Sequence, residues 1–419
     1  MEQLYPRSLE NSITKYLHRK EIIGIRGARQ VGKTTLLKGF LSSVSGDQAF
    51  ISMDLTEHRR ALEESPFEFI QRQKRAGQKL TLFLDEIQKV NDAGEKLKII
   101  YDHFPDVKIM VSGSSSLELK TNVLPALVGR LLLFELYTFD LGEYLNVKDQ
   151  GLWKIYQAKH RSLQAFLAGN SLIEKPAFPQ ELVKHWKEYV IFGGYPEIAK
   201  SNEEEEKKTL LKNIFNLYLE KDIAGFFKIE DTSSFGDFLK ALSFTIGNLI
   251  NLSSLAAKIS LPFRKTEEYL HLLQHTYIIH IVKPFHRNVL TEIKKSPKAY
   301  FLDLGLRNAV LNNFIAFDNR TDAGQLMENH VCRQLVSHFG DYDLHFWRTT
   351  GKAEVDFILT RGEEIIPVEV KLSGKTVGKS FHSFLKVYRP KKAIIVTLDH
   401  FAQEQINQTT LFYVPVFYF

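Results

Sequence analysis

Short apolar runs rich in β-branched and aromatic residues alternate with amphipathic stretches between residues 20 and 140. Four of these runs are expected to be strands, at residues 21–25, 49–55, 80–86 and 107–113. Strands that alternate with helices usually form a parallel sheet with helices on its faces. The pattern therefore predicts an α/β domain over residues 1–140.

The middle of the chain is helical and aromatic. Residues 141–230 are predicted to be a helical lid or connector, interrupted by a turn at FGGYPEIA (192–199). Residues 231–298 contain a helix SSLAAKI, a turn SLPF, a second helix RKTEEYLHLLQHT and a strand YIIHIV. This order is typical of a winged helix-turn-helix.

The last part, residues 299–419, mixes β-rich runs with two helical stretches and is predicted to be a second α/β domain. The expected helices lie near residues 324–339 and 379–388. The expected strands are KAYFLDL, LHFWRT, VDFILT, IIPVEVK, KAIIVTL and LFYVPVFYF.

Bulk properties narrow the class of protein. A chain of 419 residues is too long for one ordinary core. Its single cysteine, Cys332, excludes an internal disulfide framework and fits a reducing cytoplasm. The start of the chain lacks the apolar region of a signal peptide, and no apolar run approaches the roughly 18 residues of a membrane span. The net charge of +6 and pI of about 9.0 favour a polyanionic partner.

The segment GARQVGKT fits the phosphate-loop pattern G-x-x-x-x-G-K-[ST], between an expected strand and an expected helix. Its backbone N–H groups and the helix N-terminus would surround the phosphates of ATP. Lys33 is predicted to reach the β- and γ-phosphates, and the Thr34 hydroxyl to bind Mg²⁺. The predicted nucleotide-binding residues are Gly27, Ala28, Arg29, Gln30, Val31, Gly32, Lys33, Thr34 and Thr35.

Two acids stand at the carboxyl end of the strand LTLFLDE, where ligands of such sheets bind. Asp85 is predicted to hold Mg²⁺, and Glu86 to polarise the attacking water. The next strand ends in serines, of which Ser114 is the preferred γ-phosphate sensor, although a helix cap explains a serine equally well. Arg130 is a candidate arginine finger for a neighbouring subunit, with a surface arginine as the alternative.

The second helix of the helix-turn-helix is the expected recognition helix. Lys258, Arg264 and Lys265 are predicted to contact DNA phosphates. Glu267 and Glu268 follow directly and disfavour a groove-facing helix, so protein binding is an equal alternative.

The hairpin AEVDFILTRGEEIIPVEVK (353–371) carries acids within apolar runs. Strand alternation would place Glu354, Asp356 and Ile358 on one face, opposite Val355, Phe357 and Leu359. Asp356, Glu369 and Lys371 then share a polar face, with spacing D-x₁₂-E-x-K. Two carboxylates suit a divalent cation, and a lysine suits water activation or phosphate stabilisation. Glu328, on a preceding helix, would be a further ligand; a solvated hairpin face is the plain alternative.

Several motifs together resemble a widespread prokaryotic family of P-loop ATPases of the AAA+ superfamily, with a C-terminal domain of unknown function 4143. They are IIGIRGARQVGKTTLL, LFLDEIQ, VSGSSS, LVGR, FGGYPE, YLEKDI and PKAYFLDLGLRNAVL. The resemblance implies an ATPase core, a winged-helix middle, a restriction-endonuclease-like C-terminal domain and ring-shaped oligomers. The C-terminal layout is similar to the PD-(D/E)xK nuclease superfamily, with Glu328, Asp356, Glu369 and Lys371 at its acid, acid, acid and lysine positions.

The leading hypothesis is an ATP-hydrolysing protein that acts on DNA, through a C-terminal domain that cuts or binds it. One alternative is an ATP-driven regulatory switch that binds a protein partner. The other is a DNA-binding motor that does not cleave.

Overall fold

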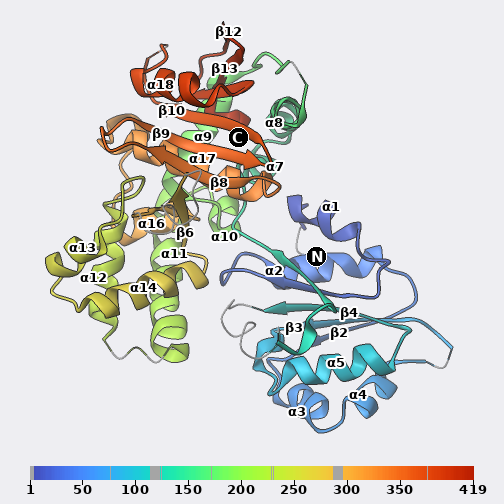
Figure 1. Cartoon of the computed structure of the whole chain (residues 1–419). Helices are drawn as coiled ribbons and strands as arrows, with labels where there is room; N and C mark the ends of the chain where they lie inside the picture. Colours follow the sequence, from blue (N-terminus) through green and yellow to red (C-terminus); the bar gives the residue numbers. More distant parts are fainter. Residues whose placement is uncertain are drawn as a thin grey trace. The chain divides into compact units, whose positions relative to one another are not determined.

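The computed structural model describes residues 4–419 except 76, 114–122, 124, 171, 228, 230, 286–295 and 375. The chain divides into two compact units (Figure 1). Unit 1 holds Met1–Thr138 and His275–Tyr277, and unit 2 holds Phe139–Gln274 and Ile278–Phe419.

Unit 1 is built on a parallel sheet that has five strands in its described residues, in the order β2-β3-β4-β1-β5. The four strands expected from the sequence are all present, and β3 is fully buried. The fifth strand, whose sequence is LLLFE and whose residues are all half-buried, was not predicted. The strands are β1 (Ile22–Arg26), β2 (Asp47–Ser52), β3 (Leu80–Asp85), β4 (Val107–Gly113) and β5 (Leu131–Glu135).

The helices of unit 1 bury apolar residues against this sheet. One cluster joins Leu82 and Leu84 of β3 to Leu97 and Ile100 of a flanking helix. This packing fixes the strand ends that carry the polar residues described below. The helices are α1 (Ser8–Thr14), α2 (Lys33–Gly39), α3 (Thr56–Glu64), α4 (Pro66–Gln73) and α5 (Ala93–His103).

Unit 2 begins with helices, as the sequence predicts for residues 141–230. They are α7 (Leu141–Lys148), α8 (Gln150–Ala168), α9 (Pro179–Phe192), α10 (Pro196–Lys200) and α11 (Glu204–Leu217), followed by a π-helical segment (Tyr218–Phe226). The turn at FGGYP separates α9 from α10, and Pro196 begins the new helix, where a missing N–H has no cost.

The expected helix-turn-helix consists of α13 (Leu252–Lys258) and α14 (Phe263–His275), preceded by α12 (Thr232–Ser243). The expected wing strand is β6 (Ile279–Pro284). β6 differs from the prediction in its partners, because it pairs with β7 (Lys298–Phe301) and with β8 (Asp343–Arg348). It is therefore part of the C-terminal sheet.

In the described part of unit 2 that sheet has eight strands, in the order β12-β13-β11-β10-β9-β8-β6-β7. The two predicted helices are present as α17 (Ala323–His338) and α18 (Lys379–Tyr388), and a short α16 (Leu304–Val310) follows β7. The remaining strands are β9 (Glu354–Arg361), β10 (Glu364–Lys371), β11 (Lys392–Thr397), β12 (Ala402–Ile406) and β13 (Thr409–Pro415). β12 was not predicted, because its sequence AQEQI is mostly polar and exposed.

A β-bulge in the hairpin overturns the predicted division of its faces. The register between β8 and β9 shifts between His345 and Trp347. Ile358 pairs with His345 and Val355 pairs with Trp347, and these two β8 residues lie on the same face of their strand. Val355 and Ile358 pack in the same cluster with Phe381 of α18, whereas Phe357 packs on Tyr300. Ile358 therefore does not share a face with Glu354 and Asp356, because the extra residue of a bulge reverses strand alternation.

The motifs FGGYP and DLGLRN meet inside unit 2. Asp303 caps α16 by accepting from Leu306 N at 2.9 Å, and it also accepts from Gly194 N at 2.9 Å. A Cβ at Gly305 would lie 1.9 Å from the carbonyl oxygen of Phe192, so only glycine fits there. The two motifs are thus explained by packing.

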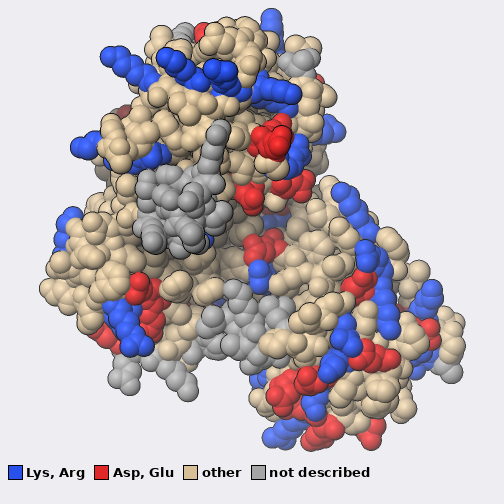
Figure 2. Space-filling view, viewed as in Figure 1, with Lys and Arg blue, Asp and Glu red and all other residues tan. Residues whose placement is uncertain are grey.

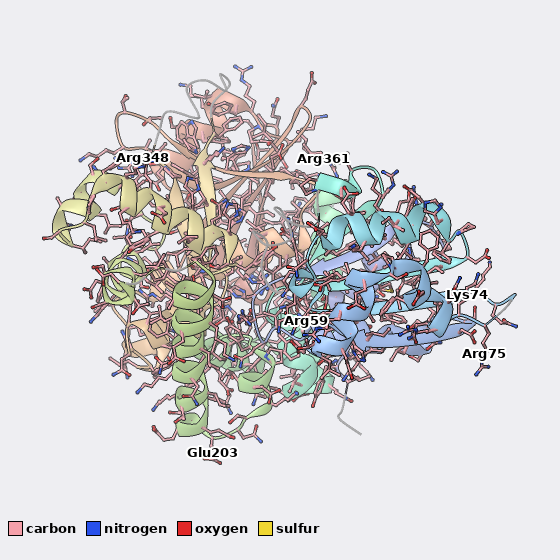
Figure 3. The ribbon with its side chains drawn as sticks, turned by 90° about the horizontal axis from the view of Figure 1, so that it is seen from below. Arg59, Lys74, Arg75, Glu203, Arg348 and Arg361 are labelled. Carbon is pink, nitrogen blue, oxygen red and sulfur yellow. The ribbon has the colours of Figure 1, made fainter. Side chains whose placement is uncertain are left out.

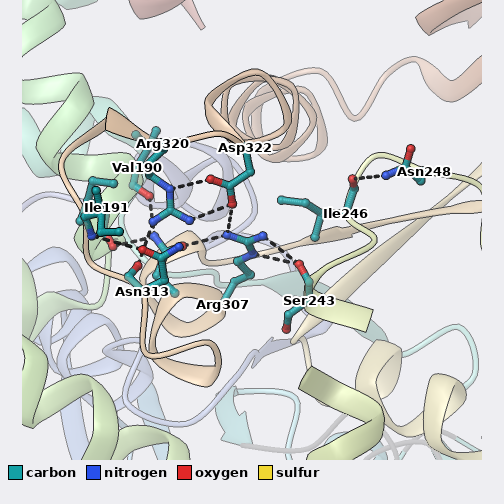
Figure 4. A network of polar contacts seen from close by, with 11 residues as sticks. Val190, Ile191, Ser243, Ile246, Asn248, Arg307, Asn313, Arg320 and Asp322 are labelled. Atoms are coloured by element: carbon teal, nitrogen blue, oxygen red, sulfur yellow. Dashed lines mark hydrogen bonds and ion pairs between the residues drawn. The ribbon is translucent and has the colours of Figure 1, made fainter. Parts of the chain in front are cut away.

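A buried polar network extends from the same helix (Figure 4). Arg307 donates to the Ser243 carbonyl at the end of α12 and pairs with Asp322 at 2.6 Å. Arg320 pairs with the same carboxylate at 2.7 Å. Burial alone would raise the pKa of Asp322, but hydrogen bonds from Arg320 and Arg307 outweigh it and lower that pKa to about 2.

Candidate functional sites

The phosphate loop between β1 and α2 depends on two glycines. A Cβ on Gly27 would lie 2.0 Å from the carbonyl oxygen of Leu136, and Gly32 has a φ of 94°. Both conditions exclude an ordinary side chain. The loop therefore places the predicted residues 27–32 directly before the N-terminus of α2, which begins at Lys33 and contains Thr34 and Thr35.

Lys33 is folded back onto its own loop. Its ammonium donates to the carbonyl oxygens of Gly27, at 3.1 Å, and Ala28, at 2.7 Å, and only 5% of the residue is exposed. These acceptors carry only partial charge. A phosphate group at the loop would therefore be a far stronger partner for the same ammonium.

Asp85 lies at the carboxyl end of β3, next to the start of α2. Thr34 Oγ1 donates to Asp85 Oδ2 at 2.8 Å, and Ser112 Oγ donates to the other carboxylate oxygen. A hydroxyl and a carboxylate held together are hard oxygen ligands of the kind that Mg²⁺ prefers. The donor set therefore fits this ion.

Glu86 follows in a left-handed conformation, with a φ of 56°. Gln88 Nε2 donates to Glu86 Oε2 at 2.5 Å, and the Glu86 backbone N–H donates to Ser112 Oγ at 3.3 Å. These bonds fix the direction of the carboxylate beside Asp85. The predicted sensor Ser114 lies outside the described residues, and Ser112, two residues earlier, is the serine that touches the acids.

Arg130, the predicted arginine finger, is bound within its own unit. Its guanidinium pairs with Asp102 at 3.0 Å, and it lies 5.8 Å from the centre of the Tyr101 ring. The carboxylate of Asp102 has a lowered pKa because of the hydrogen bond from Arg130. A role towards a second subunit would require this pair to open.

The C-terminal acids gather around a lysine that the sequence analysis did not single out. Lys298 of β7 is 1% exposed. Its ammonium lies 2.6 Å from Glu354 Oε1 and 3.2 Å from Glu328 Oε1. Tyr300 also donates to Glu328 Oε1, at 2.5 Å.

Asp356 and Glu369 lie in the same electrostatic environment. Burial raises the pKa of Asp356 well above its usual range, with the charges of Glu328 and Glu369 adding to the effect. Burial likewise raises the pKa of Glu369 to about 7, although Lys371 opposes the shift. The Asp356 carboxylate accepts from Val370 N at 2.8 Å, so it is held between the two strands of the hairpin.

The predicted metal ligands Glu328, Asp356 and Glu369 are thus neighbours, but they do not form a metal cage. Leaving aside the undescribed positions, no three His, Cys, Asp or Glu side chains in residues 4–419 converge closely enough to hold a metal ion. Lys371 Nζ donates to the Thr376 carbonyl at 2.7 Å.

With both sites described, the chain can be compared with known families. Residues 19–145 match the family described as AAA domain, and residues 323–417 match the domain of unknown function DUF4143. This chain joins a P-loop AAA domain to a C-terminal DUF4143 domain. Residues 183–315 match a further domain of unknown function, DUF8612, which includes both FGGYP and DLGLRN.

Two similar proteins align with this chain over most of their own length. An uncharacterized protein of Haemophilus influenzae is 22% identical over 424 residues, covering 97% of this chain and 97% of its own length. An uncharacterized protein of Methanocaldococcus jannaschii is 25% identical over 384 residues, covering 89% of this chain and 80% of its own. The similarity therefore extends along most of this chain.

Solved structures are more distant. The Walker-type ATPase PABY2304 of Pyrococcus abyssi has a TM-score of 0.44 and 16% identity, covering 74% of this chain and 97% of that one. The RuvB Holliday junction branch migration motor of Thermotoga maritima has a TM-score of 0.27 and 13% identity, covering 70% and 96%. Among the described residues, no helix is both long and apolar enough to cross a membrane.

The predicted DNA contacts lie on α13 and α14, in the part of the sequence between the AAA match and the DUF4143 match. Lys258 and Arg264 are exposed. Lys265 instead pairs with Glu268 at 3.3 Å and lies over the Tyr269 ring. Glu268 therefore neutralises one of the three predicted contacts.

The DUF4143 domain carries a second basic surface that the sequence analysis missed. Residues 372–398 contain no Asp or Glu, and Figure 2 shows basic side chains gathered over the region of α18. We use the name α18 surface for Lys379, Lys386, Arg389 and Lys391. All four residues are exposed, and none forms an ion pair with a described residue. Elsewhere, half-buried Lys74 pairs with Asp106 at 3.3 Å, and exposed Arg361 pairs with Glu364 at 3.0 Å (both bases are labelled in Figure 3).

Arg7 is another functional candidate without a motif. Its guanidinium donates to the carbonyl of Val31 in the phosphate loop at 2.8 Å and to that of Tyr137 at 2.7 Å. It therefore ties the loop to the chain that follows β5. A lone arginine before a short helix offers no sequence signal for such a contact.

Proposed function

We propose that the AAA domain binds ATP with Mg²⁺ and hydrolyses it, and that the DUF4143-containing unit engages DNA. The observation that carries the first part is the Thr34–Asp85 hydrogen bond of 2.8 Å beside Lys33. Bound Mg²⁺ would neutralise charge on the β- and γ-phosphates. Thr34 and Asp85 would hold it.

The other residues of the site have separate tasks. Lys33 exchanges the carbonyls of Gly27 and Ala28 for phosphate oxygens, and so stabilises the charge that develops on the leaving group. Glu86 orients and polarises the attacking water. Ser112 keeps the Asp85 carboxylate in the direction that the metal needs, since it binds the oxygen that Thr34 does not.

The Lys33→Ala variant tests the ATPase assignment. We expect kcat/KM for ATP to fall by at least about a hundredfold, as when one preorganised charge-stabilising donor is removed. Lys38→Ala is the matched control, because Lys38 is exposed in the last turn of the same helix. Undiminished hydrolysis in Lys33→Ala would refute the assignment.

The α18 surface supports the second part. Its four cations have no acidic partner among the described residues, and a phosphate backbone supplies evenly spaced negative charge. α14 offers less, because Lys265 is already paired. We propose that α18 lies along the backbone, with Lys258 and Arg264 as further contacts.

Salt dependence measures this contact directly. Replacing Lys379, Lys386 and Arg389 together by Ala should reduce the slope of log K against log salt by about 2 to 3, since each phosphate contact adds about 0.9. The control replaces Lys200 and Lys208, which pair with Glu197 and Glu205 on the surface of unit 2. An unchanged slope would place the contact elsewhere, and Lys265→Ala then tests α14.

Hydrolysis rates with and without DNA separate the remaining alternatives. Stimulation of ATP hydrolysis by duplex or branched DNA supports a protein that acts on DNA. A rate that is indifferent to every DNA, together with absent binding, supports a regulatory switch with a protein partner. A mass measurement with a non-hydrolysable ATP analogue tests whether the chain forms a ring-shaped homo-oligomer, in which Arg130 would act on the nucleotide of a neighbouring subunit.

A further inference from the structure

We propose that Lys298 is a built-in cation that takes the place of a divalent metal in the acidic cluster of the DUF4143 domain. The cluster consists of Glu328, Glu354, Asp356 and Glu369. The consequence is that this site holds its shape without metal and does not perform metal-dependent cleavage.

The first support is the position of the ammonium. It lies within 3.2 Å of carboxylate oxygens from two different elements, Glu328 of α17 and Glu354 of β9. Lys298 itself comes from a third element, β7, and is almost fully buried. A buried ammonium needs close acceptors, and a carboxylate is the strongest of them.

The second support is that oxygens of Glu328 and Glu354, the two acids nearest the ammonium, already accept from donors within the chain. Glu328 Oε1 accepts from both Lys298 and Tyr300. Glu354 accepts from Lys298 with one oxygen and from Arg348 with the other, at 2.9 Å. A divalent cation would have to displace these donors and lie beside a fixed positive charge, which Coulomb repulsion opposes.

Electrostatics agree with the geometry. Burial opposes the charged form of Lys298, but the carboxylates of Glu328, Asp356 and Glu354 outweigh it and raise the pKa of this lysine above its ordinary value. The close carboxylates therefore favour the charged form of this buried amine.

Manganese binding tests the inference without any appeal to nuclease activity. An Asp85→Asn background removes a ligand of the AAA site, and calorimetric titration with MnCl₂ then reports on the C-terminal cluster. We expect no bound Mn²⁺ in this background. Adding Lys298→Met should create one site per chain, and a further Asp356→Asn should abolish it.

Lys298→Arg, which retains the charge, should bind no Mn²⁺. The inference fails if the Asp85→Asn protein already binds Mn²⁺ and Asp356→Asn removes that binding. This comparison needs no change at Lys298, so it decides the question even if Lys298→Met does not fold. ATP hydrolysis and DNA binding are measured separately, and their failure would leave this inference standing.

Discussion

Two buried lysines, one in each unit, have opposite kinds of partner. Lys33 in the AAA domain donates to two backbone carbonyls of its own loop. Lys298 in unit 2 is paired with two carboxylates. A neutral acceptor is readily exchanged for a phosphate oxygen, whereas a buried ion pair is not readily opened.

The difference shows how to distinguish a site that can bind its ligand from one that only has a similar set of residues. Both regions combine acids, a lysine and strand ends, and both match a pattern of catalytic residues. In the AAA domain Asp85 is bound to the hydroxyls of Thr34 and Ser112, and Lys33 donates to backbone carbonyls. In the acidic cluster the cation is already paired with two of the acids, Glu328 and Glu354.

The largest predicted effect is on stability. Lys298→Met should lower the free energy of unfolding by about 3 to 5 kcal/mol, because it leaves buried carboxylates without their cation. Lys33→Met should lower it by less than about 1.5 kcal/mol, because the Gly27 and Ala28 carbonyls to which Lys33 donates are neutral acceptors. Urea unfolding of both variants measures the contrast, and similar losses would contradict it.

Asp322 is the reverse case of Lys298. Its single carboxylate is paired with two guanidinium groups, those of Arg307 and Arg320. Asp322→Asn should lower the free energy of unfolding by about 1 to 2 kcal/mol at neutral pH, allowing for partial exposure of the carboxylate. Its pKa falls from 3.8 to about 2 on folding, so the stabilisation is present above about pH 4 and is lost as the pH falls through 2. The wild-type and variant unfolding curves should therefore converge in acid; a constant difference from pH 7 to 2 would count against this explanation.

The Ser112→Ala variant tests how the Asp85 carboxylate of the AAA site is held in place. Without the Ser112 hydroxyl, Asp85 keeps its bond to Thr34 but loses the donor on its second oxygen. We expect kcat for ATP to fall about tenfold, the equivalent of roughly 1.4 kcal/mol. Ser42→Ala, on the exposed turn after α2, is the control and should leave kcat unchanged.

The smallest effect is expected at the surface. Lys386→Ala should change the free energy of unfolding by less than about 0.5 kcal/mol, because its side chain is exposed and has no described partner. It should nevertheless weaken DNA binding. A stability loss as large as that of Lys298→Met would mean that exposed and buried lysines do not differ as argued.

The candidate AAA site could be proposed from sequence because each of its parts has a local signal. The phosphate loop lies within a few residues, and Asp85 follows a fully buried strand. The acidic cluster could be predicted only in part. Lys298 lies 30 residues before Glu328, and strand alternation could not reveal the bulge beside Asp356. Both features arise from tertiary packing, which local periodicity does not record.

One consequence of strand β6 is mechanical. The strand that follows the helix-turn-helix is hydrogen-bonded to β7 on one side and to β8 on the other. Only residues 276–278 separate the end of α14 from the start of β6. We therefore expect a displacement of the helix pair to reach the sheet that carries the acidic cluster.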